Sequence, residues 1–438
     1  MEKYIPNIFF AFILIAGIGY FVMNVRKLIR NIKLGKDIDR TDRKPERWKN
    51  MAKIALGQYK MVRRPVSGIL HIVVYVGFIL INIELLEIVI DGLFGTHRVF
   101  QPLIGNGLYG FLIGSFEILA LLVLLAVIVF WFRRNIERIK RFMSAEMEGW
   151  PKNDGNIILY FEIVLMTLFL VMNATDTPFQ EAGAGNVVSQ FIAPWFEGFS
   201  HDALHTIEKT AWWLHIVGIL IFLNYLYYSK HLHILLAFPN TFFANLNAKG
   251  QFNNLESVTN EVKMMMDPDA DPYAMPEEGA EDEVPEKFGA SDVADLNWVQ
   301  LMNAYTCTEC GRCTSSCPAN LTGKKLSPRK IMMDTRDRLE EVGKNIDANE
   351  GQFNPDGKQL LDDYITREEL WACTSCNACV QECPVNIDPL SIIMDMRRYL
   401  VMEESAAPQE LNMMMTNIEN NGAPWQYSQM DRLNWKDE

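Results

Sequence analysis

Cysteine is absent from the first 306 residues of this 438-residue chain, and all eight cysteines fall between positions 307 and 383. A secreted disulfide scaffold spreads its cysteines through a short chain, so this crowding indicates metal ligation in a reducing compartment. Basic residues are outnumbered as well, with 41 Lys and Arg against 54 Asp and Glu and a net charge of -13. That balance argues against nucleic acid as the main partner, because nucleic acid requires a basic face.

Long apolar runs, in contrast, are frequent before residue 230. A helix needs ~20 apolar residues to cross the hydrocarbon core of a membrane. The first run is long and lacks a small-residue cleavage site, so we expect a retained span and not a signal peptide. The five predicted spans are Ile5–Val25, Ile69–Ile90, Phe111–Phe132, Ile157–Asn173 and Ala211–Tyr228.

The distribution of Lys and Arg predicts how these spans are oriented. Segment 26–64 carries fourteen basic residues and segment 133–156 carries six, whereas 91–110 has only Arg98 and 174–206 has none. The sequence therefore predicts an inner (cytoplasmic) membrane protein of several passes with its N-terminus outside. The cysteine-rich region after Ser229 is then cytoplasmic, which agrees with a reducing compartment.

Histidine is scarce, and all seven histidines lie between positions 71 and 233. His71 is at the inner end of the second span, and His231 and His233 follow the inner end of the fifth. A b-type haem held by two imidazoles needs one from each of two facing helices at the same depth, and intramembrane histidines are usually functional. We predict His71 with His233 as haem ligands, with His231 as the alternative to His233. The competing interpretation is a set of interfacial histidines solvated by lipid headgroups.

His215 lies too far from His233 to share one haem, because 18 helical residues span roughly 27 Å. It falls near the outer face, at the depth of Glu84 and Glu87, which are three residues apart and share a helix face. Carboxylates at this depth suggest a proton path or a quinone pocket, unless water hydrates them at the interface. A second haem would require a partner for His215 from the outer segments, which contain His97, His201 and His205.

Two cysteine motifs with the same spacing occupy the C-terminal half. They read Cys-x2-Cys-x2-Cys-x3-Cys-Pro, beginning at Cys307 and at Cys373. This spacing holds cubane [4Fe–4S] clusters, and in two-cluster ferredoxins the fourth cysteine ligates the other cluster. Zinc is the competing metal, but zinc sites pair two cysteines with two distant ligands. We therefore predict Cys307, Cys310, Cys313 and Cys383 for cluster 1, and Cys373, Cys376, Cys379 and Cys317 for cluster 2.

The surroundings of these motifs are helical in pattern. Pro328 after Ser327 predicts a helix start, and we expect helices at Arg329–Val342, Thr366–Leu370 and Asp388–Met402. No dinucleotide fingerprint, P-loop or nucleophile motif is present, and no cysteine remains as a catalytic thiol. The preceding segment 249–300 holds thirteen acidic and three basic residues, which predicts a poorly ordered acidic connector, or less simply a docking strip for a basic partner.

The membrane half resembles the haem b (gamma) subunit of respiratory nitrate reductases, a five-helix protein with two bis-histidine haems. The likeness is carried by Leu70-His71-Ile72 and by Leu214-His215 followed by the stretch from Ser229 to Ile234. It implies that His71 and His233 hold the haem nearest the cytoplasm. The family's other second-helix histidine falls at Ile81, so the resemblance leaves His215 without its partner and the second haem open.

The C-terminal half, from about Phe288, resembles the ferredoxin segment of heterodisulfide reductase-like iron–sulfur oxidoreductases. The likeness is carried by four stretches: 305–313, 326–328, 370–374 and 419–425. In that family the chain usually continues into cysteine-rich CCG domains. The present sequence stops at Glu438, where those domains would begin. The resemblance implies that the terminal chemistry resides on a separate cytoplasmic subunit, either a CCG-domain iron–sulfur protein or an electron-transfer flavoprotein.

These expectations combine into an all-α protein. We predict a five-helix transmembrane haem b domain over 1–240, an acidic linker over 241–295, a helical ferredoxin domain with two [4Fe–4S] clusters over 296–404, and a tail over 405–438. The expected function is electron transfer between quinone (or menaquinone) and a cytoplasmic redox partner, as a subunit of a quinone-linked oxidoreductase. The alternatives are a complete reductase acting on its own substrate, and a membrane anchor without haem.

Overall fold

The computed structural model describes residues 4–267 and 287–437, and within these ranges the chain is helical without any β-sheet. Two isolated bridges, Lys36 with Asn297 and Leu361 with Ile365, are the extended pairings found there. Five helices are long and apolar enough to cross a membrane, as predicted. They are α1 (Ile5–Ile32), α3 (Pro65–Phe94), α5 (Asn106–Asn135), α6 (Trp150–Thr175) and α8 (His201–Tyr225).

Local sequence explains where these helices begin and end. Proline occupies the first turn of α1, α3 and α6, where its fixed φ suits a helix and its missing N–H costs nothing. The hydroxyl of Ser200 caps α8 by accepting a hydrogen bond from the amide of Ala203 at 3.2 Å. Gly95 ends α3 in the left-handed conformation, with φ of 71°.

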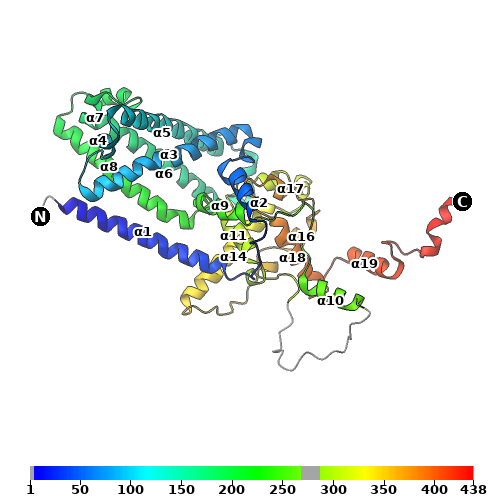
Figure 1. Cartoon of the computed structure of the whole chain (residues 1–438). Helices are drawn as coiled ribbons and strands as arrows, with labels where there is room; N and C mark the ends of the chain where they lie inside the picture. The colour runs from blue at the N-terminus through cyan, green and yellow to red at the C-terminus, as the bar shows by residue number, and fades with distance from the viewer. Residues whose placement is uncertain (1–3, 268–286, 438) are drawn as a thin grey trace.

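The bundle is formed by α3, α5, α6 and α8, and α1 lies along one side of it, against α3 and α8 (Figure 1). Side chains of α1 such as Phe12 and Ile15 are exposed, as a lipid-facing helix requires. Shorter helices cover the two ends of the bundle. These are α2 (Lys44–Met51), the π-helix η2 (Ala52–Leu56), α4 (Phe100–Ile104), α7 (Thr177–Ala182) and α9 (His233–Phe242).

The cysteine-rich half is a cluster of helices at one end of this bundle, next to α9 (Figure 1). The three helices predicted there are present as α14 (Pro328–Ala348), α16 (Arg367–Ala372) and α18 (Pro389–Met402). A further helix, α19 (Gln409–Asn421), projects away from the body with the C-terminal segment. The remaining helices are α11 (Trp298–Thr306), α12 (Arg312–Ser315), α13 (Pro318–Leu321), α15 (Leu360–Asp363) and α17 (Ala378–Glu382).

The acidic connector differs from the expectation in its described part. Residues Glu256–Met266 form helix α10, and Ala290, Val293 and Leu296 are buried in the core of the cysteine-rich half. Apolar residues spaced by three positions within an acidic segment are enough to anchor it. The acidic runs at 268–272 and 277–283 lie outside the described residues.

The two halves share one hydrophobic core. Leu28 of α1, Ile158 of α6 and Phe222 of α8 belong to the same buried cluster as Leu301 and Ile331 of the cysteine-rich half. A second cluster, which includes Phe116 and Phe169, fills the interior of the bundle. These buried contacts hold the adjoining ends of α1, α6 and α8 against the cysteine-rich half.

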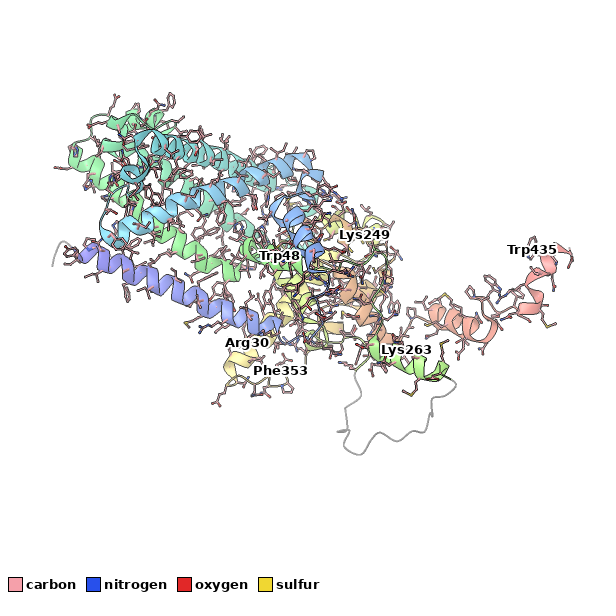
Figure 2. The ribbon with its side chains drawn as sticks, in the orientation of Figure 1. Arg30, Trp48, Lys249, Lys263, Phe353 and Trp435 are labelled. Carbon is pink, nitrogen blue, oxygen red and sulfur yellow. The ribbon has the colours of Figure 1, made fainter. Side chains whose placement is uncertain are left out.

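Several basic residues of segment 26–64 lie in this junction. Figure 2 labels Arg30 at the end of α1, where its guanidinium donates to the carbonyl of Gly343 in α14 at 3.0 Å. The neighbouring Asn31 donates to the hydroxyl of Tyr305 at 3.0 Å. Arg47 is fully buried and donates to the carbonyl of Ala244 at 3.0 Å. Arg30 and Asn31 therefore hold the two halves together, whereas Arg47 fastens α2 to the segment after α9.

Candidate functional site: two cysteine loops and a histidine pair

The two cysteine motifs adopt the same local conformation. Each begins at the residue that ends a helix, Cys307 after α11 and Cys373 after α16. Within each loop two residues take the left-handed conformation at matching positions, namely Glu309 and Gly311 in the first loop and Ser375 and Asn377 in the second. Gly311 has a φ of 71°, and a Cβ there would lie 2.7 Å from Nη1 of Arg329, so glycine suits this position. The equal spacing of the motifs thus corresponds to equal backbone turns.

The folding of the chain brings cysteines of the two motifs together. Cys307, Cys310, Cys313 and Cys383 line one cavity, of about 390 Å³ including its open mouth, to which Cys379 also contributes. On the other side, Cys317 is an electrostatic neighbour of both Cys373 and Cys379. The fourth cysteine of each motif therefore lies beside the first three of the other, which is the arrangement that the crossed assignment requires.

Burial makes these thiols poor acids. It raises the pKa of Cys307 to about 12 and that of Cys383 to about 11, and it also raises the pKa of Cys313 and Cys373. A thiolate at these positions requires positive charge in contact with the sulfur, which metal coordination supplies. Amides already point at two of the sulfurs: Ile387 donates to Cys383 Sγ at 3.2 Å and Ser375 donates to Cys373 Sγ at 3.4 Å.

His71 of α3 faces His233, the first residue of α9. The two imidazole ring centres are 6.3 Å apart. An imidazole nitrogen lies about 2 Å from a transition metal and roughly 1 Å from its own ring centre, so two imidazoles on opposite sides of one iron are roughly 6 Å apart. Nδ1 of His71 is buried without a hydrogen-bond partner, and Nδ1 of His233 lies 3.2 Å from the carbonyl of Lys230. The pair fits an iron between the rings.

The other two candidate histidines have different surroundings. His231 lies beside His233, with ring centres 5.3 Å apart and nearly perpendicular planes, and it also contacts Phe222. Burial lowers the pKa of both His231 and His233, so each is a neutral imidazole. His215, near the middle of α8, contacts Phe169, and its Nδ1 lies 3.0 Å from the carbonyl of Leu165. No other histidine ring of the described chain contacts it.

A buried ion-pair network joins the histidine segment to the first cysteine loop. Lys230, next to His231, pairs with Glu309, next to Cys310, and their side chains are 9% and 2% exposed. Glu309 also accepts a hydrogen bond from Arg336 of α14 at 2.8 Å. Asp154 of α6 accepts from the amide of Lys230 at 3.1 Å and from the hydroxyl of Ser229 at 2.7 Å. The histidine pair and the first cysteine loop are thus held at a fixed separation.

A cavity lies deeper in the bundle, between α3, α5, α6 and α8. It encloses about 680 Å³ of space, part of it open to the surface, and most of its lining is apolar. Its polar lining includes Glu84, Glu162 and His215, and one oxygen of Glu84 is buried without a hydrogen-bond partner. Glu87, predicted to share this face, instead accepts hydrogen bonds from the amide of Phe100 and from the hydroxyl of Tyr109.

Sequence reasoning missed Glu162 and Glu117. Glu162 lines the cavity, and Glu117 is fully buried and accepts hydrogen bonds from the amides of Val188 and Ser189. The available signal was a single carboxylate within an otherwise apolar run, which is costly in a membrane and usually functional. The histidines of the outer segments are engaged elsewhere, since His97 pairs with Asp176 at 3.2 Å and His205 with Glu208 at 3.4 Å.

Comparison with known proteins supports the iron–sulfur interpretation. Residues 306–387 match the family model of a 4Fe-4S dicluster domain. Over 109 residues the chain is 33% identical to one component of the ferredoxin/F(420)H(2)-dependent CoB-CoM heterodisulfide reductase of Methanosarcina acetivorans, covering 25% of this chain and 53% of that protein. The predicted resemblance of the cysteine-rich half to heterodisulfide reductase proteins is confirmed. The resemblance of the membrane half to the nitrate reductase gamma subunit stays a prediction.

Two relatives match nearly the whole chain. It is 30% identical to the "Probable iron-sulfur-binding oxidoreductase FadF" of Bacillus subtilis over 95% of its length. It is 26% identical to the "EtfAB:quinone oxidoreductase" of Syntrophomonas wolfei over 97% of its length. In both comparisons the chain spans 59% of the relative's length. No solved structure matches this chain.

Proposed function

We propose that this chain is a membrane-bound electron-transfer subunit that carries electrons between the quinone pool and a cytoplasmic redox partner. The observation that carries the proposal is the buried pair between Lys230 and Glu309. These two residues are sequence neighbours of His231 and of Cys310, so the pair holds the histidine site and the first cysteine loop together. Electron transfer requires such proximity of redox groups, whereas a passive anchor has no need for it.

The residues that would hold two [4Fe–4S] clusters are the eight cysteines in the crossed arrangement. Cys307, Cys310, Cys313 and Cys383 would hold cluster 1, and Cys373, Cys376, Cys379 and Cys317 would hold cluster 2. When bound, the clusters supply one-electron chemistry at potentials that the protein tunes. The cysteines proposed for cluster 1 lie next to the membrane half, because Lys60 of that half donates to the carbonyl of Cys383 at 3.1 Å. Cys376 is exposed, which leaves the side of cluster 2 open to a soluble partner.

The residues that would hold a haem b are His71 and His233, with His231 as the alternative to His233. The 6.3 Å ring separation and the unpartnered Nδ1 of His71 support this assignment. When bound, a bis-histidine haem supplies one-electron transfer at the depth of the inner membrane face. The carbonyl of Lys230 beside Nδ1 of His233 would fix the ring orientation and leave Nε2 for the iron.

The cavity around Glu84, Glu162 and His215 would hold the quinone. A quinone ring suits a mostly apolar pocket with a few convergent polar groups. The carboxyl groups and the imidazole would exchange protons with the quinone oxygens. His215 would serve here in place of a second haem ligand, because Phe169 and not another histidine lies against it.

The orientation rule for basic residues supports an N-terminus outside and a cysteine-rich half in the cytoplasm. The cytoplasmic partner would be a CCG-domain iron–sulfur subunit or an electron-transfer flavoprotein. The name of the Syntrophomonas relative, "EtfAB:quinone oxidoreductase", supports the flavoprotein and the quinone together. The domain limits proposed from the sequence, 1–240, 241–295, 296–404 and 405–438, describe this division of labour.

Spectra of purified variants test the haem assignment. The reduced-minus-oxidised spectrum of the wild-type protein should show a b-type α-band, and His71→Ala and His233→Ala should abolish it. His215→Ala is the matched control, because it removes another buried histidine of the same bundle and should retain the band. Loss of the band in His215→Ala with its retention in His71→Ala would refute the assignment.

Quinol oxidation tests the cavity. The purified chain should reduce an artificial acceptor with a soluble menaquinol analogue as donor, and Glu162→Gln and His215→Ala should slow this reaction at least tenfold. His205→Ala, an exposed histidine of the same helix, should not change the rate. Equal rates in all four proteins would locate the quinone elsewhere.

A further inference from the structure

Basic side chains lie beside the cysteines proposed for cluster 1. Lys60 is only 9% exposed, and its ammonium donates to the carbonyls of Cys383 at 3.1 Å and of Val380 at 3.4 Å. Arg312, inside the first loop, donates to the carbonyls of Lys60 at 3.0 Å and Met61 at 3.1 Å. The side chain of Arg141 is an electrostatic neighbour of Cys310. Lys60 and Arg141, which belong to the basic segments used to predict membrane orientation, thus lie near the proposed site of cluster 1.

These three cations are not neutralised by carboxylates in direct contact. Within the described part of the chain, the side-chain hydrogen bonds of Lys60 and Arg312 go to carbonyl oxygens and to the sulfur of Met61. Nε of Arg141 is buried without a partner. Three uncompensated positive charges therefore remain.

Other charges near the first loop are paired and contribute less. Arg329 is bound to Glu146 at 2.6 Å, and Arg64 lies 3.8 Å from Glu382. Glu309 lies within the first loop, but both Lys230 and Arg336 contact it. The local balance around the first loop is therefore positive.

The cysteines proposed for cluster 2 have one cation and one acid beside them. Arg397 donates to the carbonyl of Cys373 at 2.6 Å and stacks on Trp371 at 4.9 Å. Asp388 is an electrostatic neighbour of Cys379 and opposes that charge. Lys60 reaches this motif only through backbone carbonyls, those of Val380 and Cys383. The amide-to-sulfur hydrogen bonds, one at Cys383 of cluster 1 and one at Cys373 of cluster 2, do not separate the two sites.

We infer that Lys60, Arg312 and Arg141 raise the reduction potential of cluster 1 above that of cluster 2. The inference rests on the proposed function. Reduction adds a negative charge to a cluster that its thiolates already make anionic, and nearby positive charge stabilises the reduced form. Burial acts in the opposite direction, because a low-dielectric environment disfavours the extra charge. Three cations without a contacting carboxylate lie beside the cysteines proposed for cluster 1 and oppose this effect.

This difference in potential would set the direction of electron transfer between the two clusters. With both clusters bound, one electron would pass from reduced cluster 2, oxidising it by one electron, to oxidised cluster 1, reducing it by one. No bond would form or break, and no further reactant is required. The electron would then reside beside the histidine pair, so the residues of the chain would favour transfer from the cytoplasmic side toward the membrane. The three cations are tuning residues and do not react.

An EPR-monitored redox titration of the purified full-length chain tests the inference. The wild-type protein should show two one-electron waves. Lys60→Met should shift the upper wave downward by about 59 mV, which is a tenfold change for a one-electron couple, and leave the lower wave in place. Arg397→Met should shift only the lower wave. Lys49→Met, an exposed lysine of the same basic segment, should shift neither.

Two further variants keep the test decisive. Lys60→Arg retains the charge and should restore the wild-type potential, which a purely structural role of Lys60 does not require. If Lys60→Met fails to incorporate iron, Arg141→Met measures the same effect from a half-buried position. An unmoved upper wave in both charge-removing variants, or movement of the lower wave instead, would overturn the inference. Absence of clusters from the wild-type protein would refute the proposed function itself, so the two failures are distinguishable.

Discussion

Removing the carboxylate of Glu309 should destabilise the junction between the two halves more than removing either cation beside it. Glu309 Oε1 accepts from Arg336 at 2.8 Å, and its other oxygen contacts Lys230. The three side chains are 2%, 14% and 9% exposed, so solvent screens them little. Breaking a buried pair by removing one partner costs about 3–5 kcal/mol, because a buried charge is left uncompensated.

Glu309→Gln removes the acid that the two buried cations share, and it leaves Lys230 with Asp154 at 3.8 Å and Arg336 with the exposed Asp337 at 3.1 Å. Its cost should lie within about 3–5 kcal/mol. Lys230→Met leaves Glu309 paired with Arg336, and Asp154 still accepts from Tyr225 at 2.6 Å and from Ser229 at 2.7 Å. Its cost should lie near or below about 3 kcal/mol. Because the two residues share a contact, the double variant should cost less than the sum, with a coupling of about 1–3 kcal/mol.

The assay is urea unfolding of the detergent-solubilised holoprotein, followed by tryptophan fluorescence and by cluster absorbance. Lys325→Met is the control, since Lys325 and Glu368 form an ion pair that is 69% and 61% exposed. Its cost should not exceed about 1 kcal/mol. The reasoning fails if Glu309→Gln unfolds within about 0.5 kcal/mol of wild type, or if Lys230→Met costs more than Glu309→Gln.

Two further predictions concern α14. Gly343→Ala should lower the free energy of unfolding by about 1–3 kcal/mol in the same assay, because the new Cβ would lie 2.4 Å from Nδ2 of Asn31. The control Gly19→Ala has nothing within 4 Å of its new Cβ and should change this free energy by less than about 0.5 kcal/mol. Equal effects of the two substitutions would contradict this packing. Burial raises the pKa of Asp334 to about 6 in the folded protein, in spite of the nearby Lys330. In the unfolded chain the pKa of this group is about 3.9. The stability that Asp334 contributes is therefore present at low pH and is lost as the pH rises through 6. Between pH 5 and pH 7 the wild-type protein should lose about 1 kcal/mol that Asp334→Asn does not lose, and parallel pH profiles of the two proteins would contradict the raised pKa.

The long apolar spans were predictable because an apolar run of some twenty residues fits few structures other than a membrane-spanning helix. The helix from Pro328 was predictable for a local reason, since proline after serine marks a helix start. Helix α10, in contrast, was hidden by its acidic surroundings. Helix α9 was hidden because ten residues are too short to span a membrane and its first residue, His233, was read only as a ligand.

The ligand residues could be proposed from spacing, but the contacts that hold them in place could not. Lys60 and Cys383 are separated by 323 positions, and no local pattern indicates that they touch. Lys230 and Glu309 are likewise joined only by the packing of the two halves. Glu162 was detectable in principle as a lone acid in an apolar run, whereas Glu87 shared a helix face with Glu84 and yet turned to Tyr109. Helical periodicity gives the face of a residue but not its partner.

The central claim is that the chain carries two cubane clusters beside a haem held by His71 and His233. Quantitative analysis of the anaerobically purified protein for iron, acid-labile sulfide, zinc and extractable haem tests it most directly. We predict about eight cluster irons and about eight sulfides per chain, with haem b in addition and no stoichiometric zinc. Zinc in place of iron and sulfide, or a membrane half without porphyrin, would contradict the account.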